Sequence, residues 1–99
     1  MKILIEAPAR NDLVEGYRFY EGSGEGLGEY FLATLCSDIE SLRIFGGIYR
    51  KEYKSLRRAL SRKFPFAIFY SLQEDAVVVK AVLDCRRSPS WIRKRLKKS

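Results

Sequence analysis

Apolar residues recur at helical spacing through the first half of the chain. Within residues 9–22, Leu13, Tyr17 and Tyr20 follow a helical period, which predicts an amphipathic helix. A second stripe predicts another helix over residues 27–45, and it consists of Leu27, Phe31, Leu35, Ile39, Leu42 and Phe45. A glycine-rich turn separates the two segments. We therefore expect a helical hairpin with one apolar face that needs a partner.

The remaining apolar pattern is typical of strands. Residues 2–6 form a short β-branched run, and residues 56–64 mix apolar and basic side chains at roughly alternate positions. Residues 66–72 and 76–83 are richer in Val, Ile, Phe and Ala, and a short polar turn joins them. This pair predicts an antiparallel hairpin, and its apolar surface supplies the partner that the helices need.

The C-terminal segment carries a helix start signal. Ser88 followed by Pro89 is typical of an N-cap with proline at the first helical position. Trp91, Ile92 and Leu96 would line one side of a short helix, and basic residues would line the other. The predicted order is β-α-α-β-β-β-α. It describes an α+β domain over residues 1–99, with a small twisted antiparallel sheet packed on an N-terminal helical hairpin.

Charge is divided between the two halves of the chain. Residues 1–49 carry 4 basic and 8 acidic side chains, whereas residues 50–99 carry 15 basic and 4 acidic ones, a net charge of +11. A concentrated positive surface suits an anionic partner such as nucleic acid, a ribosome or an acidic protein. The alternative is that the charge only solvates an exposed face.

Composition narrows the chemistry that the chain can perform. It has two cysteines, Cys36 and Cys85, and no histidine, so Ser-His and Cys-His nucleophile pairs are excluded. We expect both thiols to be small core residues in a reducing compartment, and we expect no metal or cofactor. No run approaches the ~20 apolar residues of a membrane span, and the N-terminus becomes charged too early for a signal peptide. The sequence predicts a cytoplasmic protein that does not bind membranes.

Several segments, in this order, resemble the RelE/ParE superfamily of bacterial toxins over nearly the whole chain. They are Asp12-Leu13, Gly16-Tyr17, Phe19-Tyr20-Glu21 and Gly26-Leu27-Gly28, then residues 62–70 and 77–83, and finally Arg86-Arg87-Ser88-Pro89-Ser90-Trp91. The resemblance implies a twisted antiparallel sheet with a helical hairpin on one face. It also implies the toxin of a type II toxin–antitoxin pair, held inactive in a hetero-oligomer by a cognate antitoxin protein. Residues 83–89 look closer to ParE-like and plasmid-stabilisation sequences than to RelE.

The resemblance implies one of two activities. RelE-like members cut messenger RNA on the ribosome and are endoribonucleases, whereas ParE-like members inhibit DNA gyrase and are not enzymes. RNA cleavage needs a base, an acid and a cationic clamp. The clamp candidates, and so the catalytic candidates of that reading, are Arg58, Arg62, Lys63, Arg86 and Arg87. RelE-like enzymes use a late tyrosine, but no tyrosine follows Tyr70 here, and the indole of Trp91 cannot exchange a proton. We therefore favour gyrase inhibition over ribosome-dependent cleavage.

A docking role uses the same basic residues together with the terminal helix. The candidates for binding the target or the antitoxin are Arg58, Arg62, Lys63, Arg86, Arg87, Trp91, Arg93 and Arg95. Structural alternatives stand beside these roles: Arg58 would solvate a strand, Asp84 would pair with Arg86 or Lys63, Tyr70 would belong to the core, and Trp91 would anchor the terminal helix. A non-toxic basic protein that binds nucleic acid is the third functional alternative.

Overall fold

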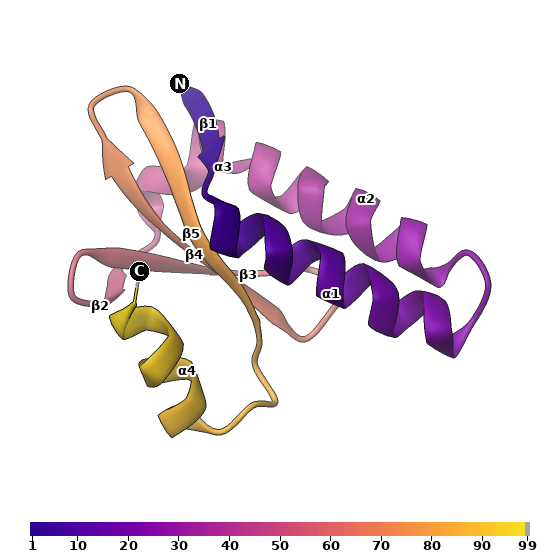
Figure 1. Cartoon of the computed structure of the whole chain (residues 1–99). Coiled ribbons are helices and arrows are strands. Elements are labelled where there is room, and N and C mark those ends of the chain that lie inside the picture. Colours follow the sequence, from indigo (N-terminus) through magenta and orange to yellow (C-terminus); the bar gives the residue numbers. More distant parts are fainter. Residues whose placement is uncertain (99) are drawn as a thin grey trace.

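The computed structural model describes residues 1–98, in which helices lie on both sides of a five-stranded sheet (Figure 1). The elements are β1 (Lys2–Ile5), α1 (Ala7–Ser23), α2 (Leu27–Glu40), α3 (Leu42–Phe45), the 3₁₀ turn η1 (Gly46–Ile48), β2 (Lys51–Tyr53), β3 (Leu56–Leu60), β4 (Phe66–Gln73), β5 (Ala76–Asp84) and α4 (Pro89–Lys97). The strand order across the sheet is β1-β5-β4-β3-β2. The α+β fold class with an N-terminal helical hairpin is confirmed.

The sheet is mixed, which refines the expectation of antiparallel pairing. β1 runs parallel to β5, with Lys2 opposite Ala76, whereas the other neighbouring strands are antiparallel. Tight turns force antiparallel pairing on β3, β4 and β5, but most of the chain separates β1 from β5 and leaves its direction free. The three-residue strand β2 was not predicted, because so short a polar segment carries no periodic signal.

The predicted helix over residues 27–45 is divided in two. α2 ends at Glu40 and α3 begins at Leu42. Between them, the Ser41 hydroxyl donates a hydrogen bond to the Asp38 carbonyl at 2.6 Å. A side-chain bond to a carbonyl of the preceding turn competes with the backbone ladder and bends helices. The periodicity prediction was therefore right about the buried face and wrong about one continuous helix.

α1 and α2 pack closely because glycines face the neighbouring helix. A Cβ atom added to Gly16 would lie 2.4 Å from the Phe31 ring, and one added to Gly28 would lie 2.8 Å from the Tyr17 carbonyl oxygen. The turn between the helices is held by Glu21, whose carboxylate accepts hydrogen bonds from the backbone N–H groups of Gly26 and Gly28 at 3.2 and 2.9 Å. The hairpin is thereby fixed as one layer over the sheet.

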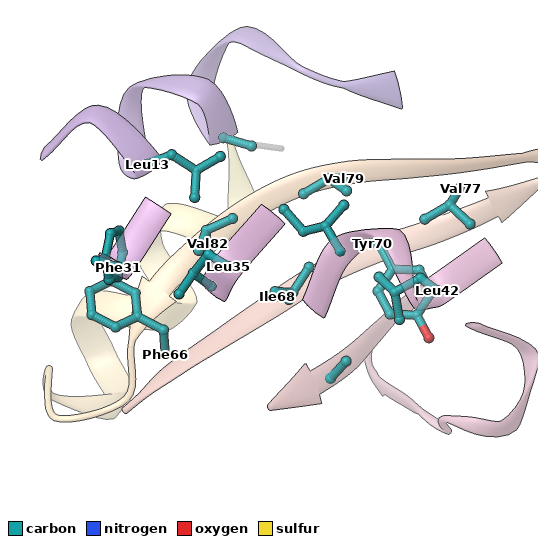
Figure 2. Close-up of a cluster of buried hydrophobic side chains, with 13 residues drawn as sticks. Leu13, Phe31, Leu35, Leu42, Phe66, Ile68, Tyr70, Val77, Val79 and Val82 are labelled. Carbon is teal, nitrogen blue, oxygen red and sulfur yellow. The ribbon is translucent and has the colours of Figure 1, made fainter. Parts of the chain in front are cut away.

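The core lies between this hairpin and one face of the sheet (Figure 2). The middle of the predicted stripe is fully covered, and its ends, Leu27 and Phe45, are 40% and 50% exposed. Tyr70 is a core residue as expected, with an exposure of 0%. Its hydroxyl donates to the Gly46 carbonyl at 2.5 Å, and burial raises its pKa to about 12. The buried side chains that meet in this cluster include Phe31, Leu35, Ile39, Leu42, Ile68, Tyr70, Val77, Val79 and Val82.

α4 covers part of the opposite face of the sheet. The Ser88 hydroxyl accepts from the Trp91 N–H at 3.2 Å and Pro89 opens the helix, so the predicted cap is confirmed. Leu96 is buried against the sheet, with Trp91 and Ile92 packed beside it. Trp91 therefore helps to anchor the helix, as the structural alternative held. The sheet residues beneath are Leu56, Ala67, Phe69, Ala81 and Leu83.

The cysteines do not occupy the positions that composition suggested. Cys36 is exposed on α2, and Cys85 is half-buried beneath α4. The expectation that both are core residues was wrong for Cys36. Its place in the helix, one position after the buried Leu35, turns the thiol toward solvent.

Candidate functional site

Three of the predicted binding arginines are engaged in ion pairs within the chain. Arg62 contacts Asp38 at 3.3 Å, Arg86 contacts Asp84 at 2.8 Å, and Arg95 contacts Asp12 at 2.7 Å. Each pair neutralises part of the positive charge that the sequence analysis assigned to docking. The positive surface that remains available is therefore smaller than the charge count implies.

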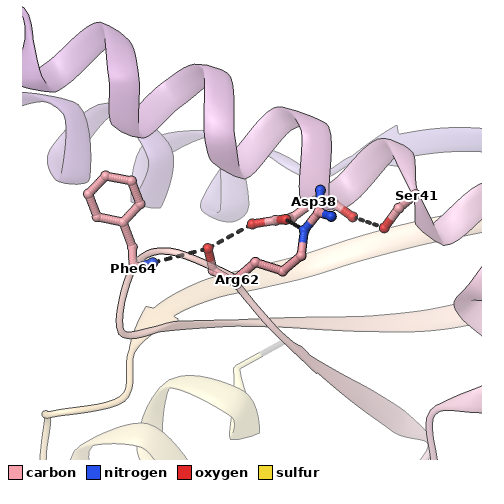
Figure 3. A network of polar contacts seen from close by, with 5 residues as sticks. Asp38, Ser41, Arg62 and Phe64 are labelled. Atoms are coloured by element: carbon pink, nitrogen blue, oxygen red, sulfur yellow. Dashed lines mark hydrogen bonds and ion pairs between the residues drawn. The ribbon is translucent and has the colours of Figure 1, made fainter.

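The Arg62 pair holds a loop against α2 (Figure 3). Asp38 is buried, and its carboxylate also accepts a hydrogen bond from the Ser61 hydroxyl at 2.7 Å. The Ser61 oxygen accepts in turn from the Phe64 N–H at 3.4 Å. The Arg62 side chain itself is 76% exposed. This network fixes the connection between β3 and β4, and it leaves the outer side of the guanidinium in solvent.

Arg86 is oriented by the residue that ends β5. Asp84 accepts hydrogen bonds from the Arg86 backbone N–H at 2.8 Å and from its Nε and Nη2 atoms at 3.0 and 2.8 Å. The pKa of Asp84 is lowered, chiefly by the side-chain hydrogen bond from Arg86, and that of Arg86 is raised. The prediction that Asp84 pairs with Arg86 or Lys63 is confirmed for Arg86.

The Asp12–Arg95 pair is the most buried of the three. The Asp12 carboxylate accepts from Arg95 at 2.7 and 2.8 Å and from the backbone N–H of Val82 at 3.0 Å. The hydrogen bond to Asp12 is the main cause that raises the pKa of Arg95. Arg95 thus fastens α4 to α1 and β5, whatever further contacts it makes.

The other candidates make no ion pair among residues 1–98. The Arg87 guanidinium lies 4.4 Å from the centre of the Trp91 ring, and Lys63 Nζ lies 5.4 Å from that of Tyr30. Arg93 is exposed on α4, and Arg58 lies in the middle of β3 opposite Phe69. These side chains retain their charge for a partner.

The predicted residues gather in two places. The backbone N–H of Cys85 donates to the Pro65 carbonyl at 2.8 Å, which brings the loop of Arg62 and Lys63 beside the turn of Arg86 and Arg87. These residues share one end of the sheet. Arg58 belongs instead to the face that α4 partly covers, and Arg93 lies on the outer side of that helix.

A larger positive surface lies on that second face, and of the cations that line it only Arg93 was predicted from the sequence. One hollow of about 320 Å³ is lined by Lys51, Lys54, Arg57 and Lys80, and the Arg57 guanidinium itself donates to the carbonyls of Gly47 and Tyr49. An adjoining hollow of about 710 Å³ is lined by Arg93, Lys94 and Lys97, and the two share Tyr53. No Asp or Glu from residues 1–98 lines either hollow. We call these residues together the cationic face.

The signal for the cationic face was present in the sequence but incomplete. The charge division pointed to the C-terminal half, yet it could not show which cations are neutralised by acids of the N-terminal half. β5 carries one extra residue at Lys80, because Phe69 pairs with Ala81 and Tyr70 pairs with Val79, and the Lys80 side chain is 19% exposed. Lys80 Nζ also contacts Glu6 at 2.9 Å.

The side chains of the cationic face suit the binding of an anionic partner, and Tyr53 also offers a phenol that could exchange a proton. Tyr70 cannot serve as an acid or base, because it is buried and its hydroxyl is used by Gly46. Tyr53 is half-buried at the junction of the two hollows, with Lys54 Nζ 5.4 Å from its ring centre.

Within residues 1–98 no group of three or more His, Cys, Asp or Glu side chains is placed to hold a metal ion. No helix of the described chain is both long and apolar enough to cross a bilayer.

Comparison with known proteins supports the fold. No protein-family model matches the chain, and no curated protein matches its sequence. A solved structure described as "Chromosomal ParDE TA system from P. aeruginosa" matches with a TM-score of 0.70 and 14% sequence identity, over 83% of this chain and 92% of that one. The α+β architecture is thus consistent with a ParE-like fold, as the sequence resemblance implied. An identity this low shows the fold alone.

Proposed function

We propose that this chain is the toxin of a bacterial toxin–antitoxin module and acts in the cytoplasm. The observation that carries the proposal is the structural likeness to a chain of a ParDE toxin–antitoxin system over most of both chains. Because one fold hosts many activities, the structural likeness favours a toxin, and the target has to be argued from the residues of the site. The sequence resemblance to RelE/ParE toxins points the same way.

We propose that the antitoxin binds to the cationic face. Among residues 1–98, seven Lys and Arg residues line its two hollows and no acidic residue does. Lys80 is paired with Glu6 and Arg57 donates to the carbonyls of Gly47 and Tyr49, so the cations available to a partner are the other five. An acidic, partly disordered segment of a partner gains both charge pairing and fast association on such a surface. Arg58 would add to the contact. The resulting complex is a toxin–antitoxin hetero-oligomer.

We further propose that the target is DNA gyrase and that the toxin acts by binding. Docking needs a shaped, charged surface and no proton transfer, and the cationic face and the Arg86–Arg87 turn offer that surface. The predicted clamp residues Arg62 and Arg86 are already paired with Asp38 and Asp84. These ion pairs hold the two guanidinium groups in fixed positions at the edge of the surface, which suits docking. They also make the two arginines less available to clamp a phosphate in a catalytic cluster.

RNA cleavage is the second candidate, and one observation favours it. No tyrosine follows Tyr70 in the sequence, but the fold brings Tyr53 next to α4 and among lysines. A phenol that adjoins Lys54 and Lys94 could exchange a proton with a ribose hydroxyl while the lysines hold the phosphate. Ribosome-bound messenger RNA would then be the substrate.

Expression of the chain alone in a bacterium separates these functions. Growth, transcript ends and DNA breaks are measured in one culture. The gyrase proposal expects arrested growth, DNA breaks and intact transcripts, whereas cut transcripts would move the assignment to cleavage. Normal growth with folded protein, together with salt-dependent binding to arbitrary nucleic acid, would overturn the toxin proposal and favour the non-toxic binding protein.

A pair of variants tests the antitoxin surface. Lys54→Glu/Lys94→Glu reverses charge at the centre of the cationic face, and Arg18→Glu is a single-site control on the exposed side of α1. We expect the double variant to lose binding to the cognate antitoxin in a pull-down with the purified proteins, a readout that does not need toxicity, and the control to keep it. Equal binding by both variants would place the antitoxin elsewhere.

A further inference from the structure

A second cleft lies on the other side of α4. It has a volume of about 430 Å³, which is within the usual range of ligand sites, and it opens between α1, the end of β5 and α4. Its apolar lining is Gly16, Phe19, Phe66, Val82, Leu83 and Trp91. Phe19 stands at its mouth and is 60% exposed. A large aromatic side chain this exposed beside an apolar floor indicates a surface that gains by being covered.

The charges around this α1–α4 cleft are balanced, unlike those of the cationic face. Three acidic and three arginine side chains line it. Four of them form the pairs Asp12–Arg95 and Asp84–Arg86. The remaining two are Glu15, on α1, and Arg87, in the turn between β5 and α4. The cleft therefore has an apolar floor, with the acidic Glu15 on one edge (the acidic lip) and the basic Arg87 on another (the basic lip).

We propose that the α1–α4 cleft docks a segment of a partner protein by an apolar anchor. The anchor side chain lies between Phe19 and Trp91, an acidic neighbour pairs with Arg87, and a basic or polar neighbour faces Glu15. Aromatic anchors in desolvated pockets supply most of the energy of such contacts, and charges at the rim orient them.

The charge balance distinguishes this occupant from nucleic acid. A phosphate backbone requires several free cations, because its affinity comes from neutralised phosphates. Here two of the three arginines are neutralised by buried or oriented carboxylates, and Glu15 would repel a phosphate. An amphipathic peptide matches both lips.

This docking site does not depend on the toxin proposal. It lies across α4 from the cationic face, and Trp91 lines hollows on both sides of the helix. The chain could lack any toxicity and still bind a peptide here, and a toxin could bind its antitoxin on the cationic face alone.

The test uses labelled peptides and the whole chain. The probe places Leu-Phe between an acidic and a basic end, in both sequence directions, and binding is followed by fluorescence anisotropy. Control peptides replace Leu-Phe with Ala-Ala, or the acidic residues with Lys. Phe19→Ala and Arg87→Glu are compared with Phe45→Ala and Arg50→Glu, which change exposed positions elsewhere. Trp91 is the single tryptophan, so its emission reports on the cleft.

We expect the anchor peptide to bind about tenfold more tightly than the Ala-Ala peptide, and to lose about tenfold with Phe19→Ala and with Arg87→Glu. The Phe45 and Arg50 variants should stay within about twofold. Arg87→Glu should regain affinity for the Lys peptide, a reversal that a purely structural role of Arg87 would not produce. The proposal is overturned if the peptide binds regardless of Phe19 and Arg87. It is overturned equally if an oligonucleotide or a second copy of the chain occupies the cleft instead, detected by competition or by sedimentation of Phe19→Ala.

Discussion

The carboxylate of Asp12 in α1 accepts two hydrogen bonds from the guanidinium of Arg95 in α4, at 2.7 and 2.8 Å and across 83 positions of the sequence. Asp12 is buried, and it also accepts from the Val82 N–H, so the pair joins α1, β5 and α4 at one point. α4 otherwise rests on the sheet mainly through Leu96 and its neighbours. The position of the terminal helix, and of both surfaces that flank it, therefore depends on this pair.

Arg95→Ala should lower the free energy of unfolding by about 3 kcal/mol, because it leaves a buried carboxylate with one backbone donor. Urea denaturation measures the loss, and Trp91 emission reports whether α4 has moved. Arg93→Ala, on the exposed side of the same helix, should change stability by less than about 0.5 kcal/mol. A double-mutant cycle with Asp12→Asn should return a coupling of about 1–3 kcal/mol, and additivity would contradict the role assigned to the pair.

Two glycines of α1 should respond in opposite directions to the same substitution. A Cβ atom at Gly16 meets the Phe31 ring at 2.4 Å, whereas one at Gly22 meets nothing within 4 Å. Gly16→Ala should destabilise by about 1–3 kcal/mol through overpacking. Gly22→Ala should stabilise by up to about 1 kcal/mol, because alanine favours the helix. Thermal unfolding of the two variants side by side checks both signs, and stabilisation by Gly16→Ala would refute the close helix contact.

Local signals in the sequence were sufficient for much of the fold. Ser88 and Pro89 marked the start of α4, because a cap requires only neighbouring residues. The stripe of α2 identified the buried Phe31 and Leu35 by its period alone. The break at Ser41 was missed, because nothing in the hydrophobic period records a hydroxyl that bonds to the preceding turn.

The candidate site was less predictable because the relevant partners are distant in sequence. Charge counting could not show that Asp38 pairs with Arg62, 24 positions later, or that Asp12 pairs with Arg95. It likewise could not show that Lys80 pairs with Glu6, 74 positions earlier in the sequence. Which cations remain available is a property of the folded chain.

Tyr70 should give the fold a measurable sensitivity to alkaline pH. Burial raises its pKa to about 12 from the ordinary value of 10.0, so folding disfavours its ionised form. The stabilisation is complete below about pH 10, where the phenol is neutral in both states, and is lost as pH rises toward about 12. Tyr70→Phe should lower stability at neutral pH by about 1 kcal/mol through the lost bond to Gly46, and the difference from wild type should shrink above pH ~10. Urea titrations from neutral to alkaline pH follow that difference, and a constant gap across the range would contradict the assignment.

Tyr53 provides the decisive comparison between the two proposed activities. Removing a general acid or base costs about 10²–10⁴-fold in rate, so Tyr53→Phe should abolish growth arrest if the chain cleaves RNA. Under the gyrase proposal the hydroxyl has no chemical task, and the ring stays packed against the buried cluster beneath α4. We therefore expect Tyr53→Phe to arrest growth as wild type does, with DNA breaks and intact transcripts. Tyr53→Ala is the control for packing, because it removes the ring that the two hollows share and should weaken arrest under either activity. Loss of arrest in Tyr53→Phe, with its unfolding midpoint unchanged, would reject the gyrase proposal in favour of cleavage.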